Sequence, residues 1–244
     1  MNYAIKTITG RRKLNEDSCC ALSLEHGGVF LAVADGMGGH AAGDVASRML
    51  IDDLSASLSS ADVIENPGNA LRRAIRNSNL SIFRYGTSRT ECKGMGTTLV
   101  CAFINGSQAT IANIGDSRLY HFDGNTLHRI TKDHSLVQTL IDEGSITEEE
   151  AAIHPMRNVI TRAVGSALYV DVDLFSVDLA EGDLLLLCSD GLHGSINDDV
   201  LCAILKQNQI LASTCDALID AAYAAGSRDN ITVVLASVKK EAEA

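Results

Sequence analysis

Hydrophobic residues along the chain fall into short continuous runs and into stripes at helical spacing. Short aliphatic or β-branched runs are typical of buried strands, and the chain has six of them: residues 29–34, 98–104, 108–114, 118–122, 184–188 and 231–238. Asn105-Gly106 joins the second and third runs, and Asp123-Gly124-Asn125 follows the fourth, so each predicts a hairpin. Because tight turns connect the runs, we expect largely antiparallel pairing.

Helical spacing marks three other segments, each interpreted as the core face of an amphipathic helix. The stripes are Val45, Met49 and Leu50; Leu71, Ala74, Ile75 and Ser78; and Leu211, Cys215, Leu218, Ile219 and Ala222. Residues 133–165 are more polar, with a short helix expected over 133–144 and a second one capped by Thr147, and they are interpreted as a flap over the sheet. Helices grouped between groups of strands favour an α+β fold.

Composition limits the class of protein. The 244 residues are 46% hydrophobic with only two prolines, which favours one domain over residues 1–240 and a frayed tail at 241–244. A net charge of −11 argues against nucleic acid or an anionic membrane as a partner. Seven cysteines without C-x-x-C spacing suit free thiols in a reducing cytosol. With no signal-peptide pattern and no membrane-length apolar run, we expect a cytoplasmic protein. We also expect it to be a monomer.

Acidic residues recur in turn-like settings beside the predicted strands. Each aspartate is flanked by Gly, Asn or Ser, in the segments 15–17, 35–40, 115–118, 189–191 and 228–230. Any one of these is a routine turn signal. Strand ends of one sheet share an edge, however, so these carboxylates can converge there, and converging carboxylates repel one another unless a cation binds between them.

The candidate ligands are all oxygens, which favours Mg²⁺ or Mn²⁺ and leaves the choice between them open. Two such ions ~3.5–4 Å apart suit attack on phosphorus, because they polarise a phosphoryl group and lower the pKa of a bridging water. The resulting hydroxide would attack directly, without a phosphoenzyme.

Seven motifs in fixed order resemble the protein phosphatase 2C (PPM) family, especially its small stand-alone bacterial members. They are NED at 15–17, DGMGGHAAG at 35–43, GTT at 96–98, IGDSR at 114–118, TKDHS at 131–135, CSDGL at 188–192 and DNIT at 229–232. The resemblance runs from about Gly10 to Val238. It implies a four-layer α-β-β-α sandwich, two central antiparallel sheets flanked by helices, with residues 133–165 as a mobile flap that influences substrate choice.

The resemblance also implies the metal ligands. Asp35 would bridge two ions, the Gly36 carbonyl would hold one of them, and Asp190 and Asp229 would complete the second ion's shell. Glu16 and Asp17 would reach metal directly or through water, and Asp116 matches the ligand of a weaker third ion. One departure concerns that third ion: Gly194 stands where many relatives carry an acidic or amide side chain.

Residues for phosphate binding and proton transfer follow from the same resemblance. Arg12 matches a phosphate-binding arginine, with its neighbour Arg11 as the competing candidate. His40 is a candidate general acid for the leaving oxygen, or else a histidine that packs at a helix start. His134 and Arg118 are expected to orient structure.

The resemblance therefore implies hydrolysis of phosphoserine and phosphothreonine in proteins, opposing a bacterial Ser/Thr kinase, with that kinase or its substrates as partners. Two alternatives remain. A non-catalytic phosphoprotein-binding relative would be expected to have lost metal aspartates, which are all present here. A hydrolase of small phosphoesters is distinguished only by assay.

Overall fold

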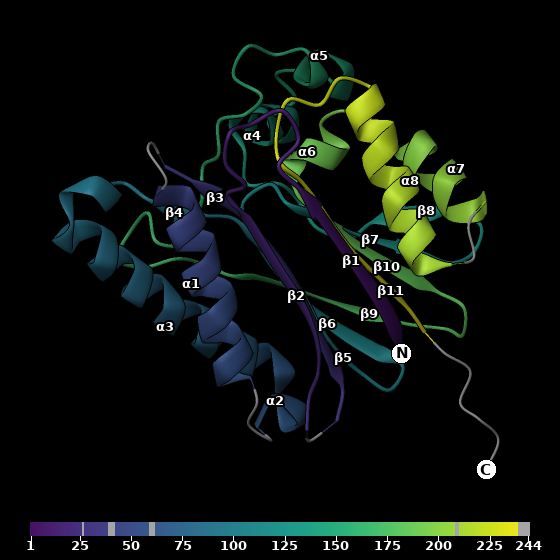
Figure 1. Ribbon diagram of the computed structural model, residues 1–244, viewed down its shortest axis with the longest axis horizontal. Coiled ribbons are helices and arrows are strands. Elements are labelled where there is room, and N and C mark those ends of the chain that lie inside the picture. The colour runs from purple at the N-terminus through teal and green to yellow at the C-terminus, as the bar shows by residue number, and fades with distance from the viewer. Residues whose placement is uncertain (26, 39–41, 59–61, 208–209, 239–244) are drawn as a thin grey trace.

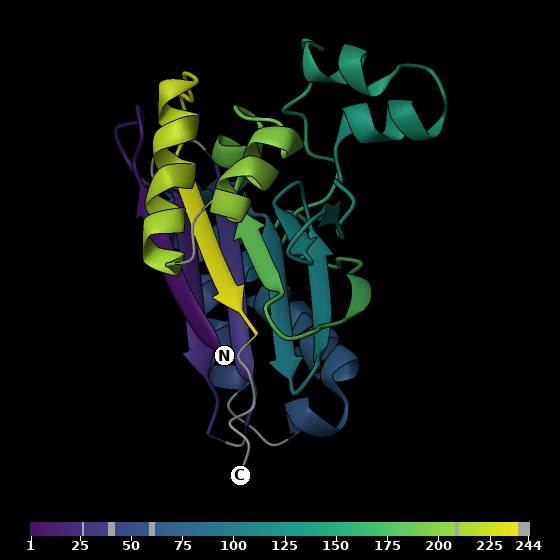
Figure 2. The ribbon, with the colours of Figure 1, turned by 90° about the vertical axis from the view of Figure 1, so that its right-hand side faces the viewer.

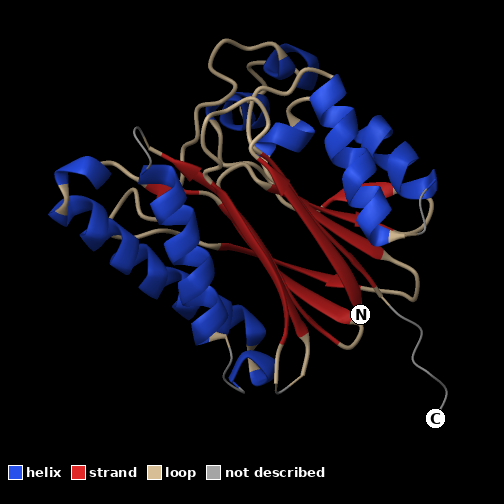
Figure 3. Ribbon diagram, viewed as in Figure 1, coloured by secondary structure: helices blue, strands red, loops and turns tan. Residues whose placement is uncertain are grey.

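The computed structural model describes residues 1–25, 27–38, 42–58, 62–207 and 210–238. Two antiparallel sheets lie face to face in the middle of the molecule, and helices cover the outer face of each (Figures 1 and 3). The expected α-β-β-α sandwich is confirmed. Three buried apolar clusters hold the layers together, one under each helical layer and one between the sheets.

The first sheet has the strand order β1-β11-β10-β7-β8. Its strands are β1 (Asn2–Ile8), β7 (Arg118–Phe122), β8 (Leu127–Arg129), β10 (Leu184–Cys188) and β11 (Ile231–Ser237). The helices on its outer side are α6 (Asp190–His193), α7 (Asp198–Gln207) and α8 (Leu211–Ala224). The predicted stripe of α8 faces the sheet, where Cys215, Leu218 and Ala222 are buried.

The second sheet has the order β2-β3-β5-β6-β9, with the short β4 paired to β3. Its strands are β2 (Asp17–Ser23), β3 (Val29–Met37), β4 (Gly96–Thr97), β5 (Leu99–Asn105), β6 (Gln108–Ile114) and β9 (Asp173–Asp178). Its outer helices are α1 (Ala42–Ser57), α2 (Asp62–Glu65), α3 (Pro67–Ser88) and the 3-10 turn η1 (Thr90–Cys92). The stripes predicted for α1 and α3 both pack into the cluster beneath them.

The strands that the sequence predicts are the inner strands, and the strands that it misses lie at the edges or are very short. β3, β5, β6, β7, β10 and β11 lie inside their sheets and match the six apolar runs closely. β1, β8, β2 and β9 are the four edges, and their residues are largely exposed or half-buried. An inner strand is apolar on both faces because helices cover one side and the other sheet covers the second. An edge strand lacks that pattern.

Both predicted hairpins form. The β5–β6 turn is shifted by one residue, because Asn105 pairs with Gln108 and leaves Gly106 and Ser107 as the loop, with Gly106 at φ +58°. The β7–β8 hairpin closes at Phe122 and Leu127, and Asp123 accepts backbone hydrogen bonds within its loop.

Residues 133–165 extend from the sandwich and carry two short helices, α4 (Leu136–Asp142) and α5 (Glu148–Ala152) (Figure 2). The predicted start of α4 at Asp133 is three residues early. Ser135 is its N-cap and accepts from the Gln138 amide, while Asp133 is held by ion pairs to arginines of the sandwich. Thr147 and Glu150 form the full capping box of α5, as expected.

All seven cysteines lie in the described ranges, and each is a free thiol. Five of them are buried, which supports the interpretation of the cysteines as small core residues. No described helix combines the length and the apolar character needed to cross a bilayer.

Candidate metal centre

Antiparallel pairing brings the predicted carboxylates together at one end of the sandwich. Asp17 begins β2 and pairs directly across from Asp35 of β3, so two like charges lie on neighbouring strands. Asp190 begins α6 directly after β10, and Asp229 lies just before β11. Asp116 follows β6. Strand starts and strand ends thus meet at a common edge, which is why residues far apart in the chain form one cluster.

Asp35 has four other carboxylates of the cluster near its own. Burial raises the pKa of its carboxyl well above 3.8, and the nearby charges of Asp17, Asp190, Asp116 and Asp229 raise that pKa further. The strand is held there by main-chain contacts, because the Asp35 carbonyl accepts from the Thr98 amide at 2.8 Å. The GTT motif at 96–98 therefore fixes the backbone from which Asp35 projects.

Asp17 is held by two hydroxyl groups. The hydroxyls of Ser189 and Thr232 donate to its Oδ2 at 2.8 and 2.6 Å. Its Oδ1 is buried and has no hydrogen-bond partner. Burial raises the pKa of Asp17 to about 7, although both hydroxyls act to lower it. Ser189 and Thr232 lie inside the CSDGL and DNIT motifs, so the motifs contained these supporting residues without showing their role.

Asp190 has a similar environment. Burial and the charge of Asp229 raise its pKa to about 6, while a side-chain hydrogen bond with Asp35 lowers it. Its Oδ1 is also buried without a partner. Like charges this close are unfavourable unless a proton or a cation lies between them.

Asp116 is tied to α6 through its main chain. His193 Nε2 lies 3.0 Å from the Asp116 carbonyl oxygen, so that nitrogen carries the proton and donates. Burial, followed by the charge of Arg118, lowers the pKa of His193 to about 3, and the imidazole is neutral. No sequence motif predicts this contact of His193.

Glu16 lies beside the cluster, half-buried, with burial raising its pKa. Its main chain connects the motifs: its amide donates to Asn230 Oδ1 at 2.8 Å, and its carbonyl accepts from the Gly36 amide at 3.1 Å. A Cβ on Gly36 would lie 2.1 Å from the Gly43 carbonyl oxygen, so only glycine fits there.

The two neighbouring arginines point to different partners. Arg12 Nη2 lies 2.7 Å from Asp229 Oδ2, at the edge of the cluster. The Arg11 guanidinium instead stacks over the Tyr223 ring, 5.3 Å from its centroid. A cavity of about 280 Å³ lies at the cluster, and the residues that line it include Arg12, Glu16, Asp35, Gly36, Asp116, Asp190 and Asp229. His40 lies outside the described residues.

This donor set fits hard divalent cations. It consists of oxygens, two of which are buried without partners, and the carboxylates repel one another when ionised. In the described part of the chain, no three Asp, Glu, His or Cys side chains are already arranged as a coordination group. Two of the carboxylates have other partners, since Asp229 faces Arg12 and Asp190 bonds with Asp35.

His134 and Arg118 have structural contacts, as expected. His134 Nδ1 accepts from the Gly115 amide at 2.9 Å, and its Nε2 faces Asp173 at 3.1 Å. Arg118 binds Asp133 through two nitrogens, at 3.1 and 2.8 Å. Both residues brace the chain on either side of Asp116.

Comparison with known proteins places these features in a family. Residues 9–233 match the protein phosphatase 2C family. The serine/threonine phosphatase stp of Listeria welshimeri is 42% identical over 242 residues, covering 96% of this chain and 95% of that protein.

Solved structures of serine/threonine phosphatases also resemble this chain in fold. Serine/threonine phosphatase Stp1 from Staphylococcus aureus superposes with a TM-score of 0.92 and 37% identity, covering 98% of this chain and 95% of the other. The catalytic domain of the phosphatase PstP, solved in complex with two manganese ions, has a TM-score of 0.87 and 37% identity, covering 98% of each chain. With this fold, these motifs and this clustering of carboxylates, the chain belongs to the protein phosphatase 2C family and is a serine/threonine phosphatase of the small bacterial type.

Proposed function

We propose that the chain hydrolyses phosphoserine and phosphothreonine in proteins with two divalent cations held by Asp35, the Gly36 carbonyl, Asp190 and Asp229. The single observation that carries this proposal is the position of Asp35 among four other carboxylates. Such a cluster is unfavourable by itself and becomes favourable when it binds cations. The two manganese ions in the PstP structure support the same stoichiometry.

Bound there, the cations would supply a water of lowered pKa as the nucleophile and offset charge on the phosphoryl oxygens. The chain's own residues would adjust the charge beside the ions and bind the phosphate. Asp17, fixed by Ser189 and Thr232, adds negative charge beside the ions, as does Glu16. Arg12 binds the phosphate with its planar guanidinium, and its position at the cavity rather than over Tyr223 favours it over Arg11.

Three parts of the proposal concern the wider reaction. His40 is proposed as the proton donor to the leaving serine or threonine oxygen. Asp116 is proposed to hold a third, weaker ion, with Gly194 unable to contribute a side chain. Residues 1–240 are proposed to act as one catalytic domain in the cytoplasm, working as a monomer that opposes a Ser/Thr kinase.

An assay with two substrate classes tests the proposed function. The purified protein is given phosphothreonine peptides and a panel of small phosphoesters, with Mn²⁺, with Mg²⁺ and with excess EDTA. We expect metal-dependent hydrolysis with higher kcat/KM on the peptides. Full turnover in EDTA would contradict the metal mechanism, and a clear preference for a small phosphoester would assign the chain to that class instead.

A further inference from the structure

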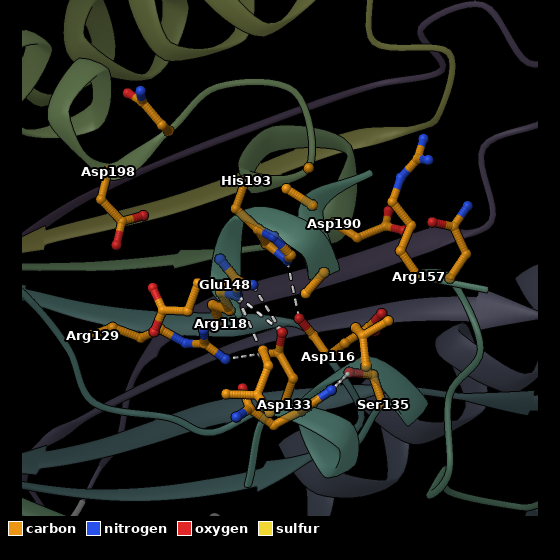
Figure 4. A pocket seen from close by; sticks show the side chains of 18 of the residues that line it. Asp116, Arg118, Arg129, Asp133, Ser135, Glu148, Arg157, Asp190, His193 and Asp198 are labelled. Atoms are coloured by element: carbon orange, nitrogen blue, oxygen red, sulfur yellow. Dashed lines mark hydrogen bonds and ion pairs between the residues drawn. The ribbon is translucent and has the colours of Figure 1, made fainter. Parts of the chain in front are cut away.

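A second, larger cavity adjoins the candidate metal centre. Its volume is about 680 Å³, and it lies between the flap helices α4 and α5 and the body of the molecule around α6 and the start of α7 (Figure 4). We call it the flap cleft. It shares Asp116, Asn158 and Asp190 with the cavity of the metal centre, so the two spaces adjoin.

The cleft has room for several side chains of a bound polypeptide, because pockets of ~300–1,000 Å³ hold whole small ligands. The metal-centre cavity, at about 280 Å³, holds little more than a phosphorylated side chain. On the proposed function, the residues that flank the phosphorylated one must lie outside it, and the flap cleft is the space next to it.

Part of the positive charge inside the cleft is neutralised, because two of its arginines share one carboxylate. Arg118 and Arg129 both contact Asp133, with Nη2 of Arg129 2.5 Å from Asp133 Oδ1 (Figure 4). Arg157 is exposed and lies toward the Asp190 side of the cleft, where a phosphate would be (Figure 4). Among the described residues that line the cleft, Arg118, Arg129 and Arg157 are the arginines, and there is no lysine.

Carboxylates line two walls of the cleft, one at the start of α5 and one at the start of α7. Glu148 and Glu149 begin α5 on the flap, and Asp198 and Asp199 begin α7 on the body. All four are exposed, and none has a basic partner among the recorded contacts of the described chain. Asp198 accepts only from the Tyr120 hydroxyl, at 3.1 Å.

Acidic residues are common at helix N-termini because they stabilise the helix, but this accounts for only part of the negative charge of Glu148, Glu149, Asp198 and Asp199. A helix N-terminus carries about half a positive charge, less than the two carboxylates on each wall, and α5 is only five residues long. Its N-terminus is already satisfied by the Thr147–Glu150 capping box. Net negative charge therefore remains on both walls and would attract a cationic side chain placed between them.

We propose that the flap cleft receives the substrate polypeptide beside the phosphorylated residue and selects lysine or arginine side chains there. The inference rests on the proposed function, because it places the chain that flanks the scissile phosphate. From the metal-centre cavity to the flap cleft, the charge of the lining changes from positive to negative. Arg12 and Arg157 lie at the phosphate end, and the carboxylates of α5 and α7 lie at the other. This distribution matches a phosphorylated residue that has basic residues on one side of it.

Matched phosphothreonine peptides test the inference. One peptide has neutral flanks, one has two lysines on the N-terminal side and one has two lysines on the C-terminal side. We expect kcat/KM to be about fivefold higher for the lysine peptide of one side, as a few partly exposed ion pairs would give, mainly through a lower KM. The preference should shrink as ionic strength rises, because salt screens exposed pairs.

The decisive comparison uses Glu148→Gln/Glu149→Gln/Asp199→Asn beside Glu143→Gln. The first protein removes wall charges and keeps both residues of the capping box, Thr147 and Glu150, and the second removes an exposed flap carboxylate that does not line the cleft. Within each protein the ratio of the lysine peptide to the neutral peptide is compared, so a change in overall activity cancels. We expect the ratio to fall to about one in the triple variant and to persist in Glu143→Gln.

Two results would overturn the inference while leaving the proposed function intact. Either wild type hydrolyses all three peptides equally, or its lysine preference survives in the triple variant. If wild type hydrolyses neither the neutral peptide nor para-nitrophenyl phosphate with Mn²⁺ or Mg²⁺, the proposed function itself fails, and this inference fails with it.

Discussion

Asp133 illustrates how a single residue of a motif can serve structure rather than chemistry. It lies in the TKDHS motif, yet its carboxylate contacts Arg118 and Arg129 and not the metal-site cluster. Burial alone would raise its pKa, but the two guanidinium groups hold that pKa below the ordinary 3.8. The residue joins the flap to β7 and β8, and so sets the position of one wall of the flap cleft.

Asp133→Asn should destabilise the fold by about 2–3 kcal/mol, because it leaves two largely buried arginines without a counter-charge. The folded pKa is depressed, so the carboxylate's contribution is complete above pH 3.8 and is lost as the pH falls through the lower folded value. Urea unfolding at pH 7 and at pH 3 measures both effects. Asp142→Asn, which breaks only an exposed pair with Lys132, is the control and should change little.

Asp35→Asn should stabilise the fold in the absence of metal, whereas Asp133→Asn destabilises it. The Asp35 carboxyl lies among like charges, so the amide should raise the free energy of unfolding in EDTA by at least about 1 kcal/mol at pH 7.5. Thermal unfolding in EDTA measures it. Asp123→Asn, at a surface turn that lowers the pKa of its carboxyl, should not stabilise the protein. A less stable Asp35→Asn protein in EDTA would contradict the repulsive cluster.

Arg12→Ala should raise KM more than it lowers kcat, because a phosphate-binding group contacts the substrate as well as the transition state. Arg11→Ala should do less, since Arg11 stacks on Tyr223. Steady-state kinetics on a phosphothreonine peptide compare the two. The reverse order would move the phosphate-binding role to Arg11.

At the scale of elements, local pattern predicts what is buried on both sides and fails where a strand is half-exposed. The β10 and β11 runs were found because helices cover one face and the other sheet covers the second. β2 was missed although it carries Asp17, since only its first and fourth residues are buried. The motifs located the acidic residues, but the register that places Asp17 opposite Asp35 required the fold.

Gly191 shows how tightly two of these elements meet. A Cβ at this position would lie 1.9 Å from the Asn230 carbonyl oxygen, so α6 and the start of β11 approach within main-chain contact. Gly191→Ala should therefore destabilise the protein by about 2–3 kcal/mol. Gly68→Ala in α3, where the nearest atom is a flexible Leu174 methyl at 3.3 Å, is the matched control and should be neutral or stabilising. Chemical denaturation in EDTA compares them, and equal stability would contradict the close contact.

At the scale of the whole molecule, the sandwich converts distant sequence segments into one charged edge. Motif order identified the family and most of the cluster, because residues such as Asp190 and Asp229 are set within recognisable turns. Motif order could not show the contacts of Ser189 and Thr232 with Asp17, or that of His193 with Asp116. It also could not show the flap cleft, whose walls come from α5 and α7, about 50 residues apart. These features depend on packing between elements and not on any local pattern.

The proposed carboxylate cluster binds two divalent cations, and hydrolysis depends on both. Calorimetric titration with Mn²⁺ tests this in wild type and in Asp35→Asn, with phosphothreonine-peptide turnover measured on the same samples. We expect two tight ions per wild-type chain, and loss of both tight binding and turnover in the variant. Two tight ions with wild-type turnover in Asp35→Asn, or full wild-type turnover in EDTA, would contradict it.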